Sequence, residues 1–320
     1  MDLNLLSLPL EILAKIFSNI PWNQLINVKL TARKFNFVTK KYLKDMQKPK
    51  PCFIEFENDY THNDGIGRIK IICHIFMINA DGIEKNVSLQ KEFFLLSSEL
   101  DHLHIFLKKF DLTSLLSVDI LLDDHTEVMR IFSDYLHNAN RICSIFVTAK
   151  NCKDDLDNTL LFLQKIKNTR FLSLDLYFPH LIVPKDFVIP VKNSLRSIRL
   201  HERENTAFVN SRMIEYIVEN NPILDGYRLS FNNFETYKMV IETIVKGELS
   251  RRNSGCLHKY ITLYLSFSSH EVFPELLRYF YSEEFPYIGT DIEDENSFNG
   301  DLGCPVCGKF DSIKIEKKTF

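Results

Sequence analysis

The residues best suited to metal binding or catalysis lie near the end of the chain, where residues 304–308 read Cys-Pro-Val-Cys-Gly. Two cysteines three positions apart on a tight turn can place both thiolates on one zinc ion. A closed tetrahedral site needs two more ligands, and no second Cys-x-x-Cys is present. The nearest upstream candidates are Cys256, His258 and His270, whose spacing does not complete a zinc pattern. Cys304 and Cys307 are therefore candidate ligands only, and we expect no bound metal or other cofactor.

No other group of residues matches a catalytic pattern. The chain has ten glycines but no phosphate-binding glycine loop, no Gly-x-Ser-x-Gly turn and no His-Glu-x-x-His pair. Residues 283–301 carry seven acidic residues without any Lys or Arg, at a spacing that does not fit a calcium-binding loop. We expect a solvated loop there, then a strand at 312–316, in a protein that is not an enzyme. A small metal-dependent enzyme built on the two thiols is the alternative.

The composition is that of an ordinary folded protein of about two domains, with 320 residues, 45% hydrophobic and 25% charged. No apolar run approaches the roughly 20 residues of a membrane span. The N-terminus lacks the basic and apolar segments of a secretory signal. Seven scattered cysteines favour a reducing compartment. We expect an intracellular protein, cytoplasmic or nuclear, that binds neither a membrane nor nucleic acid.

The first 50 residues differ from the rest in charge and pattern. They hold nine Lys and Arg against three acidic residues, a formal +6, so the other 270 residues carry −9. Apolar residues at helical spacing predict three short helices between residues 7 and 43, with Pro21 ending the first. So short a segment cannot bury all its apolar surface internally, and part of it should dock on a partner or on residues 51–320.

This segment resembles an F-box. Residues 8–21 read Leu-Pro-Leu-Glu-Ile-Leu-Ala-Lys-Ile-Phe-Ser-Asn-Ile-Pro, and residues 25–35 read Leu-Ile-Asn-Val-Lys-Leu-Thr-Ala-Arg-Lys-Phe. The Leu-Pro-x-Glu-Ile start, the Ile-Phe and Leu-Ile pairs and the closing Arg-Lys-Phe stand at the family's distances. The sequence departs from the family at Gln24, where an acidic residue is common, and at Thr31-Ala32, where Val-Cys is usual.

The resemblance implies a partner and a mechanism. F-box helices bind the acidic adaptor subunit of an SCF-type cullin–RING ubiquitin ligase, and the rest of the chain recruits a protein substrate. The adaptor-binding residues carried over by position are Leu8, Pro9, Ile12, Ile16, Leu25 and Val28. We therefore expect a substrate-recognition subunit that docks on the adaptor and, through it, on a cullin. An interaction scaffold that works outside any ligase is the alternative.

A proline-rich linker, Lys48-Pro49-Lys50-Pro51, separates the F-box domain, residues 1–48, from the rest of the chain. Residues 52–56 and 69–76 read as strands, and the Asp-Gly pairs at 64–65 and 81–82 read as turns. A small antiparallel β region is therefore predicted for residues 52–97.

One spacing of apolar residues recurs through residues 98–282: the second apolar residue follows the first by three positions, and the third follows the second by two. The six triplets are Leu115-Val118-Ile120, Ile142-Ile145-Val147, Phe171-Leu174-Leu176, Leu195-Ile198-Leu200, Leu224-Tyr227-Leu229 and Tyr260-Leu263-Leu265. Their middle residues lie 27, 29, 24, 29 and 36 positions apart, and helices are expected at 127–137, 154–167, 210–220 and 234–249. A strand and a helix repeated at nearly 30 residues resemble a leucine-rich repeat.

This second resemblance implies an α/β fold class: the three-helix F-box, then a degenerate leucine-rich-repeat-like β/α solenoid, then the acidic loop and C-terminal strand of residues 283–320. The layout also resembles the large nematode F-box families. The repeat's Asn, three places after its last apolar residue, occurs only at Asn232. A parallel α/β domain without true repeats is the alternative. Residues between the apolar positions should line an open face that binds the substrate: Asp119, Phe146, Asp175, Arg199, Arg228 and Tyr264.

Overall fold

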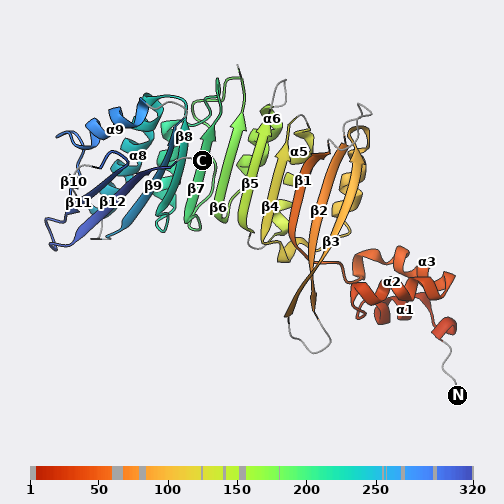
Figure 1. The fold of residues 1–320 in the computed structure, drawn as a ribbon. Helices are drawn as coiled ribbons and strands as arrows, with labels where there is room; N and C mark the ends of the chain where they lie inside the picture. Colours follow the sequence, from red (N-terminus) through yellow and green to blue (C-terminus); the bar gives the residue numbers. More distant parts are fainter. Residues whose placement is uncertain are drawn as a thin grey trace.

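The structure is a computed structural model that describes residues 5–59, 68–78, 84–123, 125–139, 142–150, 156–179, 181–253, 256, 258–267, 271–290 and 294–318. Its fold is mixed α/β, with a group of N-terminal helices before one twelve-stranded sheet (Figure 1). No helix in these ranges is long and apolar enough to cross a membrane. The two Asp-Gly turns predicted at 64–65 and 81–82 lie outside the described residues.

The N-terminal group contains the three predicted helices: α1 (Leu10–Phe17), α2 (Trp22–Thr31) and α3 (Arg33–Lys41), with 3₁₀ turns at Leu5–Ser7 and Leu43–Asp45. The first two begin directly after Pro9 and Pro21, where a missing backbone N–H costs no helical hydrogen bond. The buried side chains form a cluster separate from the core of the sheet: Leu13, Ala14, Phe17, Leu25, Val38 and Met46. The group therefore has an interior of its own.

The twelve strands of the described residues belong to one sheet with the order β10-β11-β12-β9-β8-β7-β6-β5-β4-β1-β2-β3. One edge is antiparallel: β1 (Pro51–Asp59), β2 (Arg68–Ile78) and β3 (Glu84–Leu96). Six parallel strands follow in chain order: β4 (Ser117–Leu122), β5 (Ile142–Lys150), β6 (Thr169–Tyr177), β7 (Ser197–Glu202), β8 (Gly226–Phe231) and β9 (Tyr260–Phe267). Because β1 also pairs in parallel with β4, the predicted antiparallel region is an edge of the large sheet.

The far edge is formed by the segment that was predicted to be an acidic loop and one strand. It contains β10 (Ile288–Gly289), β11 (Ser297–Gly303) and β12 (Phe310–Lys317), and β12 runs parallel to β9. Phe285, Tyr287 and Phe298 of this segment are buried. Burial of three aromatic rings draws the segment into the core despite its charge, so the loop prediction is wrong where β10 and β11 form and holds for the turns between them.

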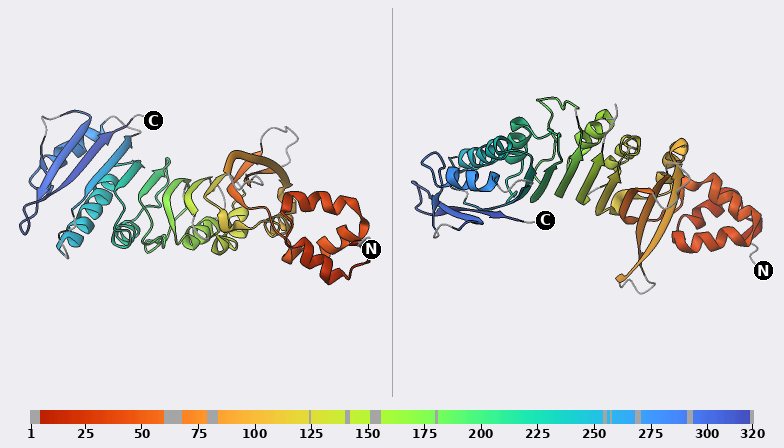
Figure 2. Two further views of the ribbon diagram at one scale, coloured as in Figure 1. Left: turned by 90° about the horizontal axis from the view of Figure 1, so that it is seen from below. Right: turned by 45° about the horizontal axis from the view of Figure 1, so that its top comes forward.

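Helices cover one face of the sheet, and the other face of β4 to β9 is open in the described part of the chain (Figure 2). The covering helices are α4 (Asp101–Leu107), α5 (Glu127–Ser133), α6 (Leu156–Lys165), α7 (Ser211–Asn220), α8 (Phe234–Asn253) and α9 (Val272–Phe280), with 3₁₀ turns at Ser97–Glu99, Leu112–Ser114 and Leu136–Asn138. The four helices expected from sequence correspond to α5 with its following 3₁₀ turn, α6, α7 and α8.

A row of buried apolar residues crosses the parallel strands in register: Val118, Ile145, Leu172, Ile198, Tyr227 and Leu263. The intervals along the chain are 27, 27, 26, 29 and 36 residues. The triplet predicted for β6 is therefore out of register, because Leu174 pairs with Val147 and Leu200 instead. Leu172, Leu174 and Leu176 are all buried, so apolar spacing alone did not distinguish them.

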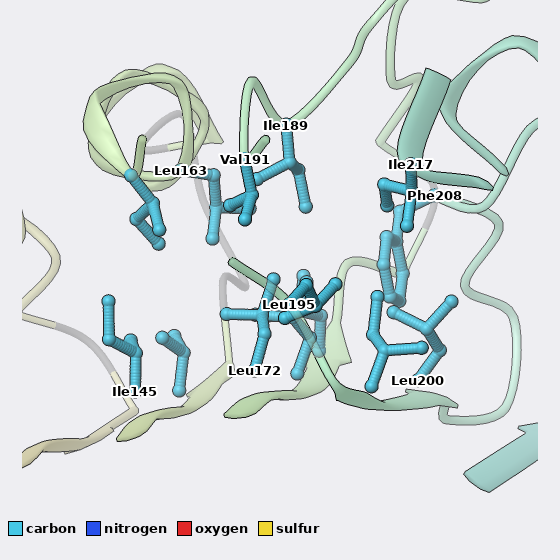
Figure 3. Close-up of a cluster of buried hydrophobic side chains, with 14 of the residues drawn as sticks. Ile145, Leu163, Leu172, Ile189, Val191, Leu195, Leu200, Phe208 and Ile217 are labelled. Atoms are coloured by element: carbon cyan, nitrogen blue, oxygen red, sulfur yellow. The ribbon is translucent and has the colours of Figure 1, made fainter. Parts of the chain in front are cut away.

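Between β6 and β7 an extended segment packs where other intervals have a helix. Its Ile189 and Val191 lie between Leu163 of α6 and Ile217 of α7, facing the side chains of the sheet (Figure 3). All four side chains are buried. Removing each such aliphatic side chain from water stabilises the fold by roughly 1.5–3 kcal/mol.

The buried side chain of Asn221 forms hydrogen bonds with backbone groups at the end of this segment. Its Oδ1 accepts hydrogen bonds from the backbone N–H groups of Ser194 (3.3 Å) and Leu195 (3.1 Å). Its Nδ2 donates to the carbonyl oxygens of Val191 and Ile217, each at 2.9 Å. The segment can therefore lie inside the protein without unpaired polar groups at these positions.

Candidate functional site

The six predicted adaptor-binding residues fall into two groups. Pro9 is exposed, and Ile12 and Ile16, one turn apart on α1, keep 47% and 39% of their surface accessible. Leu25 lies inside the helical group, and Leu8 and Val28 pack partly against the same interior. The exposed members can contact a partner directly, whereas Leu25 supports them from within.

Other exposed apolar residues of the helical group were missed by sequence reasoning. They are Leu5, Leu6, Ile26, Leu30, Phe37 and Leu43, of which Leu30 is 82% exposed. Ile26 and Leu30 lie one turn apart on α2, so their spacing carried a signal that the main apolar stripe concealed. Such a concentration of exposed apolar side chains in a small unit is typical of a docking surface.

The helical group is held together and attached to the sheet by specific contacts. Lys34 Nζ donates to the carbonyl oxygens of Leu6 (2.7 Å) and Leu8 (2.9 Å), which fixes the N-terminal turn on α3. Trp22 packs against the main core, and Lys91 Nζ of β3 lies 5.9 Å from the centre of its ring. The exposed residues of α1 are therefore presented by an anchored unit.

Five of the six predicted substrate-binding residues form one row across the open face: Asp119, Phe146, Arg199, Arg228 and Tyr264. The register places Ser173 in this row at β6, instead of the predicted Asp175. Asp175 belongs to the next row, where it pairs with Thr148 and His201.

The character of the row changes along the sheet. At its β1 end, burial raises the pKa of Glu55 and Asp119, and the neighbouring charges of Glu57 and Asp119 raise that of Glu55 further. The centre of the Phe146 ring lies 5.1 Å from the centre of the Phe171 ring. The basic Arg199 and Arg228 follow.

At its far end the row becomes aromatic, with the Arg228 guanidinium 5.9 Å from the centre of the Tyr264 ring. The row therefore runs from acidic carboxyl groups, through apolar rings, to basic and aromatic side chains. Such a surface can distinguish partners by the order of their charges.

The candidate thiols Cys304 and Cys307 are brought together with Cys256 and His258, and one donor atom from each lies within 4.8 Å of the others. His270 lies outside the described residues. Sequence spacing concealed this grouping, because the two pairs stand in loops that the sheet order makes neighbours.

Comparisons of the chain with models of protein families, with curated proteins and with solved structures give no match. The surfaces described above are therefore the basis for assigning a function.

Proposed function

We propose that the protein is the substrate-recognition subunit of an SCF-type cullin–RING ubiquitin ligase, an intracellular protein built as an F-box and a degenerate leucine-rich-repeat-like solenoid. The N-terminal helices bind the acidic adaptor, and the open face of the sheet binds a protein substrate. The mechanism is positional: a held substrate has a raised effective concentration near the ubiquitin-conjugating enzyme. No side chain of this chain takes part in the chemistry.

The exposure of Ile12 and Ile16 is the observation that carries the proposal. Both stand at positions that the F-box pattern assigns to adaptor contacts, and both remain accessible although the unit has an interior of its own. Had this apolar stripe packed only against residues 51–320, the two side chains would be covered. Apolar side chains held outward on an anchored unit suit a hydrophobic partner surface.

Charge supports the same partner. The first 50 residues carry a formal +6, and an acidic adaptor would be attracted to them before contact. This attraction chiefly raises the association rate and weakens as salt is added.

Three features support the solenoid. Strands β4 to β9 are parallel neighbours in chain order, the helices share one face, and four of the five intervals between register-matched residues lie between 26 and 29 residues. In addition, Asn232 Nδ2 donates to the carbonyl oxygens of Arg203 (2.9 Å) and Thr206 (3.3 Å). The repeat's asparagine is expected to bind backbone in this way at the turn.

Affinity purification followed by mass spectrometry tests the proposal. Wild type is compared with Ile12→Ala/Ile16→Ala and with a matched control, Ile105→Ala/Ile223→Ala, whose residues are 55% and 44% exposed and lie outside the helical group. Truncating two apolar contacts typically costs a few kcal/mol of binding, enough to remove a micromolar partner. Adaptor and cullin should be lost from the first variant alone.

The other outcomes separate the alternatives. Recovery of the adaptor without a cullin would favour the scaffold function. Recovery of neither from the wild type would contradict the F-box assignment. Proteins retained by all three forms are the substrate candidates.

A further inference from the structure

Two loops that are far apart in the sequence meet beside the last two parallel strands. Cys256 and residues 258–259 precede β9, and residues 304–309 lead into β12. Strands β9 and β12 are parallel neighbours in which Tyr260 pairs with Ser312. Loops that enter parallel neighbours reach the same end of the sheet, so the first brings Cys256 and His258 to the side of Cys304 and Cys307 from the second.

The four donor atoms lie close enough to one another to share a single metal ion. All lie within 4.8 Å of one another. The Sγ atoms of Cys256 and Cys304 are 3.8 Å apart, and two sulfurs at 2.3 Å from one tetrahedral zinc ion would be about 3.8 Å apart. The same separation is far too long for a disulfide bond of about 2.0 Å. His258 Nε2 lies 3.0 Å from Cys307 Sγ, on the exposed side of the cluster.

The backbone aims these side chains. In the second loop, the Cys304 N–H donates to the Lys309 carbonyl oxygen (2.7 Å) and the Gly308 N–H to the Cys304 carbonyl oxygen (2.9 Å). Gly308 has a φ of 72°, which glycine adopts without strain. In the first loop, Cys256 has a φ of 51°, an unfavourable value for a residue with a side chain. Residues held in this way cluster at functional sites.

An independent observation concerns the second nitrogen of His258. Its Nδ1 lies 3.2 Å from Oδ1 of Asp311, a residue only 6% exposed. The same Oδ1 accepts a hydrogen bond from the Lys259 N–H at 2.9 Å, which fixes the carboxylate. A carboxylate in this place keeps the histidine proton on Nδ1 and leaves the lone pair of Nε2 directed at the cysteines. Histidines that bind metals are oriented in this way.

We propose that Cys256, His258, Cys304 and Cys307 bind one zinc ion. Three thiolates and an imidazole favour zinc among the common divalent metals. Four protein ligands leave no open position, so the site is structural and its ion activates no water. It joins the loop after α8 to the β11–β12 connection and so fastens the C-terminal edge strands to the parallel sheet. This site does not depend on the proposed ligase function.

Metal content of the full-length reduced protein tests the site. Wild type purified from zinc-supplemented cells should contain close to one zinc ion per chain. Cys307→Ser, which removes the exposed ligand, should lose most of it. Cys143→Ser, at a partly buried cysteine outside the cluster, is the matched control and should retain it. Asp311→Asn should weaken zinc affinity by about 10- to 100-fold while leaving all four ligands in place.

Cobalt(II) substitution gives a readout that does not depend on how the variants fold. Wild-type protein reloaded with cobalt(II) should show the d–d absorption of tetrahedral coordination and a thiolate charge-transfer band. Wild type with little zinc that also gives no such spectrum would overturn the proposal. So would full zinc content in both Cys307→Ser and Asp311→Asn, or non-reducing peptide mapping that finds a disulfide between Cys256 and Cys304 in freshly purified protein.

Discussion

Asp175 of β6 and Arg203, just beyond β7, are joined by two hydrogen bonds, from Nε to Oδ1 and from Nη2 to Oδ2, each 2.8 Å long. His201 Nδ1 lies 3.3 Å from the same Oδ1. Burial raises the pKa of Asp175, but these hydrogen bonds and the charges of Arg203 and His201 outweigh it, so the pKa lies well below its usual value. Asp175 therefore links β6 to the residue just beyond β7, and both of its carboxylate oxygens are bonded within the chain.

Replacing Asp175 with Asn should lower the free energy of unfolding by about 1–3 kcal/mol at neutral pH, because it removes a charge-assisted pair. The folded-state pKa is below the unfolded one, so this contribution is complete above the unfolded pKa of about 3.9 and is lost as pH falls towards the folded value. Denaturant unfolding of wild type and Asp175→Asn should therefore give a difference that narrows in acid. A difference independent of pH would contradict the pairing.

The contribution of Glu202 to stability changes with pH in the opposite direction to that of Asp175. It is buried, and its Oε1 accepts hydrogen bonds from the N–H groups of Phe208 and Val209, each at 2.8 Å. Burial raises its pKa to about 7, against the effect of these two bonds. Because the unfolded chain ionises near its ordinary value of about 4.3, stability should fall as pH rises from there to about 7, by up to about 3 kcal/mol.

Glu202→Gln keeps the Oε1 acceptor and removes the charge. Its stability should be nearly flat over this pH range where that of wild type declines, so the variant should be the more stable form in mild alkali. Urea unfolding of both proteins at several pH values measures this. Parallel pH profiles would show that the Glu202 carboxyl group ionises as easily in the folded protein as in the unfolded chain.

Asn221 should be one of the most sensitive polar residues in the chain. Asn221→Leu leaves the N–H groups of Ser194 and Leu195 without the acceptor that the side chain provides. Each buried group left unpaired costs about 1–3 kcal/mol. Asn220→Ala, which removes one local bond from Nδ2 to the Tyr216 carbonyl oxygen, is the control. Chemical unfolding should separate the two variants, and equal losses would contradict the account.

Leu25 and Ile12 should have different effects although the F-box pattern treats them alike. Leu25 is buried in the helical group, and truncating a buried leucine to alanine costs about 2–5 kcal/mol. Ile12 is 47% exposed, so Ile12→Ala should change stability by less than about 1 kcal/mol. Amide hydrogen exchange in α1 to α3 should rise strongly for Leu25→Ala only. Similar exchange in both variants would place the two residues in similar surroundings.

Periodicity predicted most of the local structure. The three N-terminal helices, α5 to α8, β1, β2 and the parallel strands β4 to β9 were expected from where apolar residues recur, whereas α4 and α9 were not. The register of β6 did not follow, because Leu172, Leu174 and Leu176 offered equivalent apolar positions and only pairing with Ile145 and Ile198 selects Leu172. The acidic composition of the C-terminal segment led to the prediction of a loop. Burial of the Phe298 ring and its aromatic neighbours instead holds part of this segment in the sheet.

The sites were less accessible to sequence reasoning than the fold. Motif position identified Ile12 and Leu25 together, but only packing shows which of them faces outward. Cys256 and Cys304 lie close together because β12 lies beside β9 in the sheet. In the chain, these two strands are separated by α9, β10 and β11. Sequence distance holds no information about such a neighbour relationship.

Binding of the purified full-length chain to the purified ligase adaptor, measured by calorimetry at low and moderate salt, tests the central claim most directly. The account predicts micromolar or tighter binding that weakens with salt and falls at least about tenfold in Ile12→Ala/Ile16→Ala, a loss of about 1.4 kcal/mol or more. The Ile105→Ala/Ile223→Ala control should bind like wild type. No binding by the folded wild-type chain, or equal affinity in all three forms, would contradict the assignment of the N-terminal helices as the adaptor-binding unit.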